Sequence, residues 1–304
     1  MWTLYGAKDG KEKVEFIRDY VAIKSDGGTI SVDWAYPPPN HDSKDKVQKV
    51  CIVFPGLSGH SEKGYVKSLV RHLSEERGFI VGVFHNRGVA QPFTSPVFPD
   101  IASSTEIETL LTHVQEKFAD QETYIVGVGM SMGANLMLRV AGEQGDKCPL
   151  QAMVSLNNPF DVWLAINLMR NTPYEKYLAE ELKRQLLFKE GMPAAEKAVF
   201  DQMRQRYNLN FEEIQRAKSW KEWDEAYTMK IFTAYKSLGD YYLAASSLPK
   251  VKLITKPTLV IHSRDDPIVP IDCLPVRECT ENPNMIVGIV EKGGHVCYFQ
   301  GVQA

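Results

Sequence analysis

The chain has 304 residues, of which 44% are hydrophobic and 24% are charged, and its formal net charge at pH 7 is −3. This length allows a large buried core, and the charge excludes the strongly basic character typical of nucleic-acid-binding proteins. The five cysteines are scattered and odd in number, which indicates a reducing compartment rather than a disulfide framework. Their spacing is not that of a metal site, and no apolar run of ~18 residues predicts a membrane span.

The first elements along the chain are predicted to be strands. Residues 14–23 and 29–36 read as strands, and the intervening Ser25-Asp26-Gly27-Gly28 is typical of a hairpin turn. From residue 50 onward strand and helix patterns alternate, which favours a mostly parallel twisted sheet with helices on both faces. The predicted strands are 50–54, 79–84, 124–128 and 150–156, and the predicted helices are 64–77, 104–118 and 134–140.

The alternation stops after residue 158. Residues 160–247 contain no strand-like run and are rich in helix-forming side chains, with breaks at Thr172-Pro173 and Gly191-Met192-Pro193. Strand patterns return at 258–262 and 285–290. We therefore expect one core built from residues 1–158 and 248–304, with residues 159–247 inserted as a helical cap over a site.

The sequence Gly129-Met130-Ser131-Met132-Gly133 lies between a predicted strand and a predicted helix. Strand, G-x-S-x-G and helix is the pattern of a nucleophile elbow, a tight turn that presents a serine in a strained conformation. Glycine is needed two residues before and after the serine because side chains there would collide with the turn. Ser131 is the predicted nucleophile.

Two further residues follow late strands in the order that such a serine requires. Strand 258–262 leads into Asp265-Asp266-Pro267, and strand 285–290 leads into Gly293-Gly294-His295. Ser, Asp and His in this order, each after a strand, form a hydrolytic triad with His295 as base. Asp266 is the preferred acid because of its spacing to Pro270, and Asp265 remains the alternative.

Acyl transfer also needs donors for the developing oxyanion. The first core strand leads into Pro55-Gly56-Leu57-Ser58-Gly59, and a glycine-containing loop at this place supplies one donor in enzymes of this kind. The second donor is the amide of the residue after the nucleophile. We predict that the Leu57 and Met132 amides form the oxyanion hole.

Five ordered motifs together resemble one branch of the α/β-hydrolase superfamily. That branch holds the animal α/β-hydrolase-domain lipases and acetylesterases and the yeast medium-chain fatty acid ethyl ester synthase/esterases. The motifs are Pro55-Gly56-Leu57-Ser58-Gly59, Asn86-Arg87-Gly88, Gly129-Met130-Ser131-Met132-Gly133, Asp265-Asp266-Pro267 and Gly293-Gly294-His295. The resemblance implies an α/β-hydrolase fold and cleavage or transfer of short- to medium-chain acyl esters, including monoacylglycerols or other lipid esters.

The resemblance leaves several properties open. The reaction needs no cofactor, and its alternatives are transfer to an alcohol acceptor or a non-catalytic ligand-binding role. Many members carry an N-terminal membrane anchor that these residues lack, so both a cytoplasmic protein and association with a membrane surface are compatible with the sequence. The oligomeric state is not predicted. Only nine residues follow His295, where a further helix is expected.

The acyl pocket is predicted only in outline. Gly56 and Met130 flank the predicted nucleophile, and Phe232 and Tyr235 belong to a set of cap aromatics that either line an acyl pocket or form the cap core. For Arg87 the preferred role is bracing a loop through its fixed donors, with binding of a polar head group as the alternative.

Overall fold

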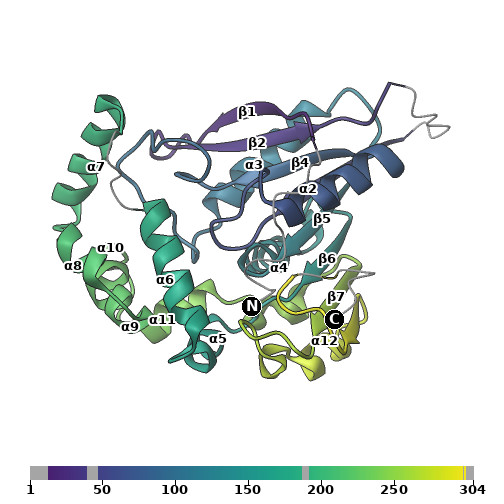
Figure 1. The fold of residues 1–304 in the computed structure, drawn as a ribbon. Coiled ribbons are helices and arrows are strands. Elements are labelled where there is room, and N and C mark those ends of the chain that lie inside the picture. The colour runs from purple at the N-terminus through teal and green to yellow at the C-terminus, as the bar shows by residue number, and fades with distance from the viewer. Residues whose placement is uncertain (1–12, 40–46, 187–191, 297, 299–304) are drawn as a thin grey trace.

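The computed structural model describes residues 13–39, 47–186, 192–296 and 298. Within them, eight strands form one sheet in the order β1-β2-β4-β3-β5-β6-β7-β8 (Figure 1). The strands are β1 (Ile17–Ala22), β2 (Thr29–Ala35), β3 (Gln48–Phe54), β4 (Ile80–His85), β5 (Thr123–Met130), β6 (Ala152–Leu156), β7 (Thr258–Ser263) and β8 (Met285–Val290). Each of them overlaps a strand predicted from the sequence.

The sheet has an antiparallel end and a parallel body. β1 pairs with β2, and β2 with β4, in antiparallel fashion, which confirms the predicted hairpin. All five remaining pairings, from β4 to β8, are parallel. The parallel strands therefore bring their carboxyl ends to one edge of the sheet, where sites of α/β proteins form.

Helices cover both faces of this sheet. In the core they are α2 (Gly64–Arg71), α3 (Thr105–Lys117), α4 (Met132–Gln144) and α12 (Val276–Glu281). The helix predicted over 64–77 is divided, because α2 ends at Arg71 and a π-helical turn, η1 (His72–Glu76), follows it.

Alternate residues of the strands face two separate hydrophobic clusters. Val50 and Ile52 of β3 pack in the cluster that includes α3 and α4, whereas Cys51 and Val53 pack in the cluster that includes α2. Because successive side chains of a strand point to opposite faces, a strand buried on both faces must be apolar throughout. This is why the core strands read as unbroken apolar runs.

The segment between β6 and β7 is helical throughout its described residues. It comprises α5 (Val162–Met169), α6 (Pro173–Leu186), α7 (Ala194–Arg206), α8 (Phe211–Arg216), α9 (Trp220–Trp223), the π-helical η3 (Asp224–Thr228), α10 (Met229–Ile231), α11 (Leu238–Ala245) and the 3₁₀ turn η4 (Leu248–Leu253). We call α5 to α11 the cap. Its helices gather on one side of the sheet (Figure 1) and form an aromatic-rich cluster of their own.

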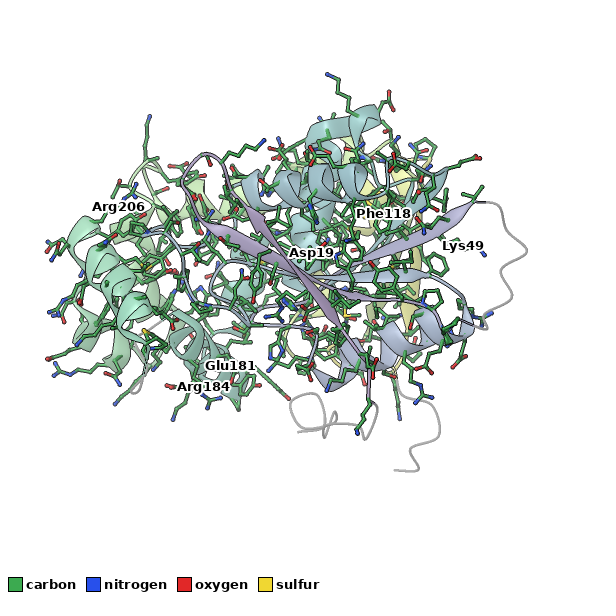
Figure 2. The ribbon with its side chains drawn as sticks, turned by 90° about the horizontal axis from the view of Figure 1, so that it is seen from above. Asp19, Lys49, Phe118, Glu181, Arg184 and Arg206 are labelled. Atoms are coloured by element: carbon green, nitrogen blue, oxygen red, sulfur yellow. The ribbon has the colours of Figure 1, made fainter. Side chains whose placement is uncertain are left out.

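The cap and the sheet are clearly separate when the molecule is seen from above. Glu181, Arg184 and Arg206 lie at the cap end, whereas Lys49 and Phe118 lie at the far end of the sheet (Figure 2). Within the described residues, no helix is long and apolar enough to cross a membrane. The residue boundaries of the three predicted parts remain a prediction, and so does the helix after His295, because residues 299–304 lie outside the described part.

Candidate active site

Ser131 occupies a sharp turn between β5 and α4. Its backbone has φ +52° and ψ −123°, a conformation that non-glycine residues rarely adopt. A Cβ on Gly129 would lie 2.5 Å from the Ala134 Cα, and a Cβ on Gly133 would lie 2.1 Å from the Phe54 carbonyl oxygen. Both glycines are therefore required by close backbone contacts, as the motif predicts.

The three predicted triad residues come together in space. The Ser131 Oγ lies 2.8 Å from the His295 Nε2, and the His295 Nδ1 lies 2.7 Å from the Asp266 Oδ2. His295 and Asp266 are buried, with 8% and 4% of their surface exposed. This linear arrangement lets the imidazole accept a proton from the hydroxyl while the carboxylate holds its other nitrogen.

The two neighbouring aspartates have different partners. Asp266 contacts His295, and its Oδ1 also accepts hydrogen bonds from the Ile268 and Val269 amides at 2.8 and 2.9 Å. Asp265 instead accepts bonds at 2.9 Å from the amides of Gly293 and Gly294. Asp265 thus holds the loop that carries the histidine, whereas Asp266 holds the histidine itself.

Asn157 belongs to the same cluster and was not predicted. It is fully buried with φ +46°, and its Nδ2 donates to the Asp266 Oδ2 at 2.6 Å and to the Ser263 Oγ at 3.1 Å. The Tyr298 hydroxyl donates to its Oδ1. A polar residue directly after the fifth core strand was the available signal, because this position lies at the same sheet edge as the triad.

The loop after β3 lies against the nucleophile. A Cβ on Gly56 would stand 3.2 Å from the Ser131 Cβ, so a side chain there would crowd the serine. Met132 is the first residue of α4, and the amide at this helix position has no intrahelical acceptor. Leu57 and Met132 both line the cavities described next.

Two cavities meet beside this loop. The first, of about 120 Å³, lies between the loop after β3 and the cap aromatics Trp223, Tyr241 and Tyr242. The second, of about 330 Å³, contains Ser131 and His295 in its wall. Gly56 lines both cavities and Phe232 lines the first, in line with their predicted positions.

Two predicted pocket residues lie elsewhere. Met130 is buried in the hydrophobic cluster that includes α2, because its position on β5 directs it to that face of the sheet. Tyr235 packs edge-on against Tyr241, with ring centroids 5.2 Å apart. Neither residue lines these two cavities. Tyr235 packs against the aromatic cluster of the cap.

Arg87 has the structural role preferred from the sequence. Its side chain is buried, and it donates to Glu106 at 2.8 Å and to Asp26 at 3.0 Å. It therefore ties the hairpin turn to α3. Burial raises the pKa of Glu106, although Arg87 opposes this effect.

A second buried polar cluster supports the loop after β3. The Ser61 hydroxyl donates to Asp33 at 2.5 Å, and the Ser61 amide donates to the His85 Nε2 at 3.0 Å. Burial lowers the pKa of His85 to about 4, so this imidazole is neutral and can accept that bond. Burial would raise the pKa of Asp33, but hydrogen bonds from Arg18 and Ser61 lower it overall.

Comparison with known families agrees with this geometry. The model of the α/β-hydrolase fold family matches residues 49–302. The chain belongs to this family. Fold class and membership therefore confirm the expectation from the sequence motifs, and the chain is called the hydrolase below.

Curated relatives place the hydrolase among lipases and esterases. It is 32% identical to the embryogenesis-associated protein EMB8 of Picea glauca, over 95% of this chain and 64% of that protein. It is 28% identical to human phospholipase ABHD3, over 94% and 67%, and 32% identical to medium-chain fatty acid ethyl ester synthase/esterase 2 of Saccharomyces cerevisiae, over 81% and 57%. The chain thus spans about two thirds or less of the length of these relatives.

Solved structures show the same fold. Est1E from Butyrivibrio proteoclasticus superposes with a TM-score of 0.56 at 18% identity, covering 92% of the hydrolase and 90% of that chain. At this identity the likeness concerns the fold alone. The hydrolase is therefore an α/β-hydrolase of an esterase- and lipase-like kind.

Proposed function

We propose that the hydrolase is a serine carboxylesterase that cleaves short- to medium-chain acyl esters through a covalent acyl-enzyme. The observation that carries this proposal is the chain of hydrogen bonds from Asp266 through His295 to Ser131. The two amides proposed as oxyanion donors lie beside it, at Leu57 and Met132. Each part is a side chain or amide of the protein, so the reaction as proposed uses no cofactor.

In the first half-reaction the Ser131 oxygen attacks the ester carbonyl carbon while His295 takes the hydroxyl proton. The carbonyl oxygen becomes negatively charged and is stabilised by the Leu57 and Met132 amides. Asp266 keeps the proton on the far imidazole nitrogen and stabilises the imidazolium. As the carbon–oxygen bond breaks, His295 gives its proton to the departing alkoxide, and the alcohol leaves.

In the second half-reaction a water molecule takes the place of the alcohol. His295 removes a proton from the water, whose oxygen attacks the acyl carbon held on Ser131. The tetrahedral intermediate uses the same two amides. Collapse returns the proton from His295 to the Ser131 oxygen, and the carboxylic acid is released.

The substrate class is supported by the cavities and by the names of the relatives. The wall of the first cavity is mostly apolar and aromatic, which suits a hydrocarbon chain. Relatives are named as a phospholipase, a monoacylglycerol lipase and an ethyl ester synthase/esterase. We therefore propose monoacylglycerols or other lipid esters as the natural class.

An alcohol acceptor is the second candidate for the same site. An alcohol that replaces water in the second half-reaction would give a new ester instead of the acid. The name of the yeast relative, a synthase and esterase, favours keeping this candidate. Product analysis in the presence of ethanol distinguishes the two, because transfer yields the ethyl ester.

The proposal is tested by hydrolysis of p-nitrophenyl esters with the wild type and Ser131→Ala. We expect a loss of at least ~10³-fold in kcat for the variant, the scale for removal of a triad member. Labelling of the wild type by a serine-directed phosphonate, absent in the variant, should accompany this loss. Equal activity of the two proteins would refute the assignment, and a wild type that neither turns over nor labels would instead indicate a ligand-binding role.

A further inference from the structure

The two cavities share one short stretch of wall. The shared residues are Gly56, Leu57, Gly59 and Met132, which come from the core loops, and Trp220, which comes from α9. Among the described residues that line both cavities, Trp220 is thus the contribution of the cap. Its indole lies at the junction, opposite the loop that carries the proposed oxyanion donors.

The chemistry assigns a different part of the ester to each cavity. The leaving alcohol must receive its proton from His295, and His295 lies in the wall of the second cavity together with Ser131. That wall also holds Lys63 and Glu181, which suit a polar alcohol. The acyl chain must then extend away from His295, across the oxyanion loop and past Trp220, into the apolar first cavity.

Trp220 is held in place by hydrogen bonds at two points. Its Nε1 donates to the Tyr242 hydroxyl at 2.8 Å, and its amide donates to Glu175 at 2.9 Å. The Tyr242 hydroxyl in turn donates to the Asp224 Oδ1 at 2.6 Å, which also accepts from Thr228 at 2.8 Å. Asp224 is 1% exposed and begins a π-helical turn, a feature often found at functional sites.

We propose that Trp220 determines the acyl-chain specificity of the hydrolase. Fixed through Tyr242 to the buried Asp224, its indole forms a rigid partition between the two cavities and limits the acyl chains that pass into the first. The inference rests on the proposed function, because it concerns the substrate of the same site. Trp220 acts by excluding volume and touches the chain, not the reacting atoms.

The test measures kcat/KM for p-nitrophenyl esters from C4 to C16 with the wild type and Trp220→Ala. Removing the indole should raise the ratio of C12 to C4 by at least about tenfold, since pocket contacts discriminate by this order per group. Leu182→Phe, which adds volume to the wall of the first cavity, should shift the ratio the other way. Trp163→Ala is the matched control, because Trp163 is a cap tryptophan that lines neither of these cavities.

Two further measurements keep the inference testable. Trp220→Phe should give an intermediate profile, and it carries the test together with Leu182→Phe if Trp220→Ala fails to fold by circular dichroism. Calorimetric binding of free fatty acids of increasing length needs no turnover, and the chain length at which affinity stops rising should be longer in Trp220→Ala.

The outcomes separate this inference from the proposed function. A wild type without Ser131-dependent turnover would refute the proposed function, whereas the fatty-acid binding series would still report on the partition. A Ser131-dependent wild type whose chain-length profile is unchanged in Trp220→Ala, Trp220→Phe and Leu182→Phe would refute the inference alone. A shift of equal size in Trp163→Ala would also refute it.

Discussion

The core edge and the cap meet at Ser131 but hold their side chains in different ways. At the core edge, residues that follow different strands are joined by directional hydrogen bonds, as in Asn157 to Asp266 at 2.6 Å. In the cap the contacts are mostly between rings, such as the stacked Phe232 and Tyr241 with centroids 4.8 Å apart.

This difference separates the two tasks of the site. Bonds of defined direction can hold a proton-transfer geometry, where a displacement of about 1 Å costs on the order of 10²-fold in rate. Ring packing defines a volume and tolerates small displacements. We therefore expect substitutions at the core edge to change kcat strongly, and substitutions in the cap to change specificity or stability.

The largest expected effect is that of Asp266→Asn. The variant amide would present a donor to His295 and favour the wrong imidazole tautomer, which should lower kcat about 10⁴-fold. Asp265→Asn is the matched control, because its Oδ1 can still accept from the Gly293 and Gly294 amides. It should lose less than tenfold. Steady-state kinetics of both variants checks this order, and the reverse order would make Asp265 the triad acid.

A smaller loss is expected for Asn157→Ala. Without its amide, the Asp266 Oδ2 loses a donor and Ser263 and Tyr298 lose a common partner, so the orientation of His295 is less well defined. We expect kcat to fall by about 10²-fold with KM nearly unchanged. Asn158→Ala changes the next buried residue, whose amide contacts Ser247 and the Phe160 backbone instead. If the two variants lose the same activity, Asn157 has no positioning role.

The two regions should also titrate in opposite directions. Burial raises the pKa of Asp224 in the cap to about 6, so the folded state binds more protons than the unfolded state between about pH 4 and 6. The wild type therefore loses stability from this group as the pH rises through that range. Asp224→Asn lacks the loss, and its stability relative to the wild type should rise by about 2 kcal/mol between pH 4.5 and 7.

His85 in the core provides the opposite case. Burial lowers the pKa of His85 to about 4, so the folded state binds fewer protons than the unfolded state between that value and about 6.5. The wild type gains stability from this group as the pH rises, and His85→Gln should fall relative to the wild type by roughly the same amount. Urea unfolding of both variants across this pH range checks the two signs. Parallel changes would show that one of these groups titrates differently.

The smallest expected effect lies at the start of α9. The Ser219 side chain accepts a hydrogen bond from the Glu222 amide at 3.2 Å and so caps the helix that carries Trp220. Ser219→Ala should lower the free energy of unfolding by about 1 kcal/mol. Hydrolysis of short esters should be unchanged. A large loss of activity with C4 esters would mean that the cap takes part in the chemistry and not only in specificity.

The sequence by itself determined the order of strands and helices and the strand-end positions of Ser131, Asp266 and His295. Strands buried on both faces must be apolar, the elbow must have glycines, and parallel strands must end at one edge, so these features leave local patterns. The choice between Asp265 and Asp266 as the partner of His295 was not local, because it depends on how two loops 29 residues apart face each other.

Only the tertiary structure decided the contacts that join distant parts of the chain. Asn157 meets Asp266 across 109 residues, and no spacing in the sequence marks that pair. Aromatic residues at helical spacing have the same pattern whether they fill the cap core, as Tyr235 does, or line a cavity, as Phe232 and Trp220 do. Which of them faces empty space depends on packing between the cap and the sheet, and packing is decided by the whole chain rather than by any segment of it.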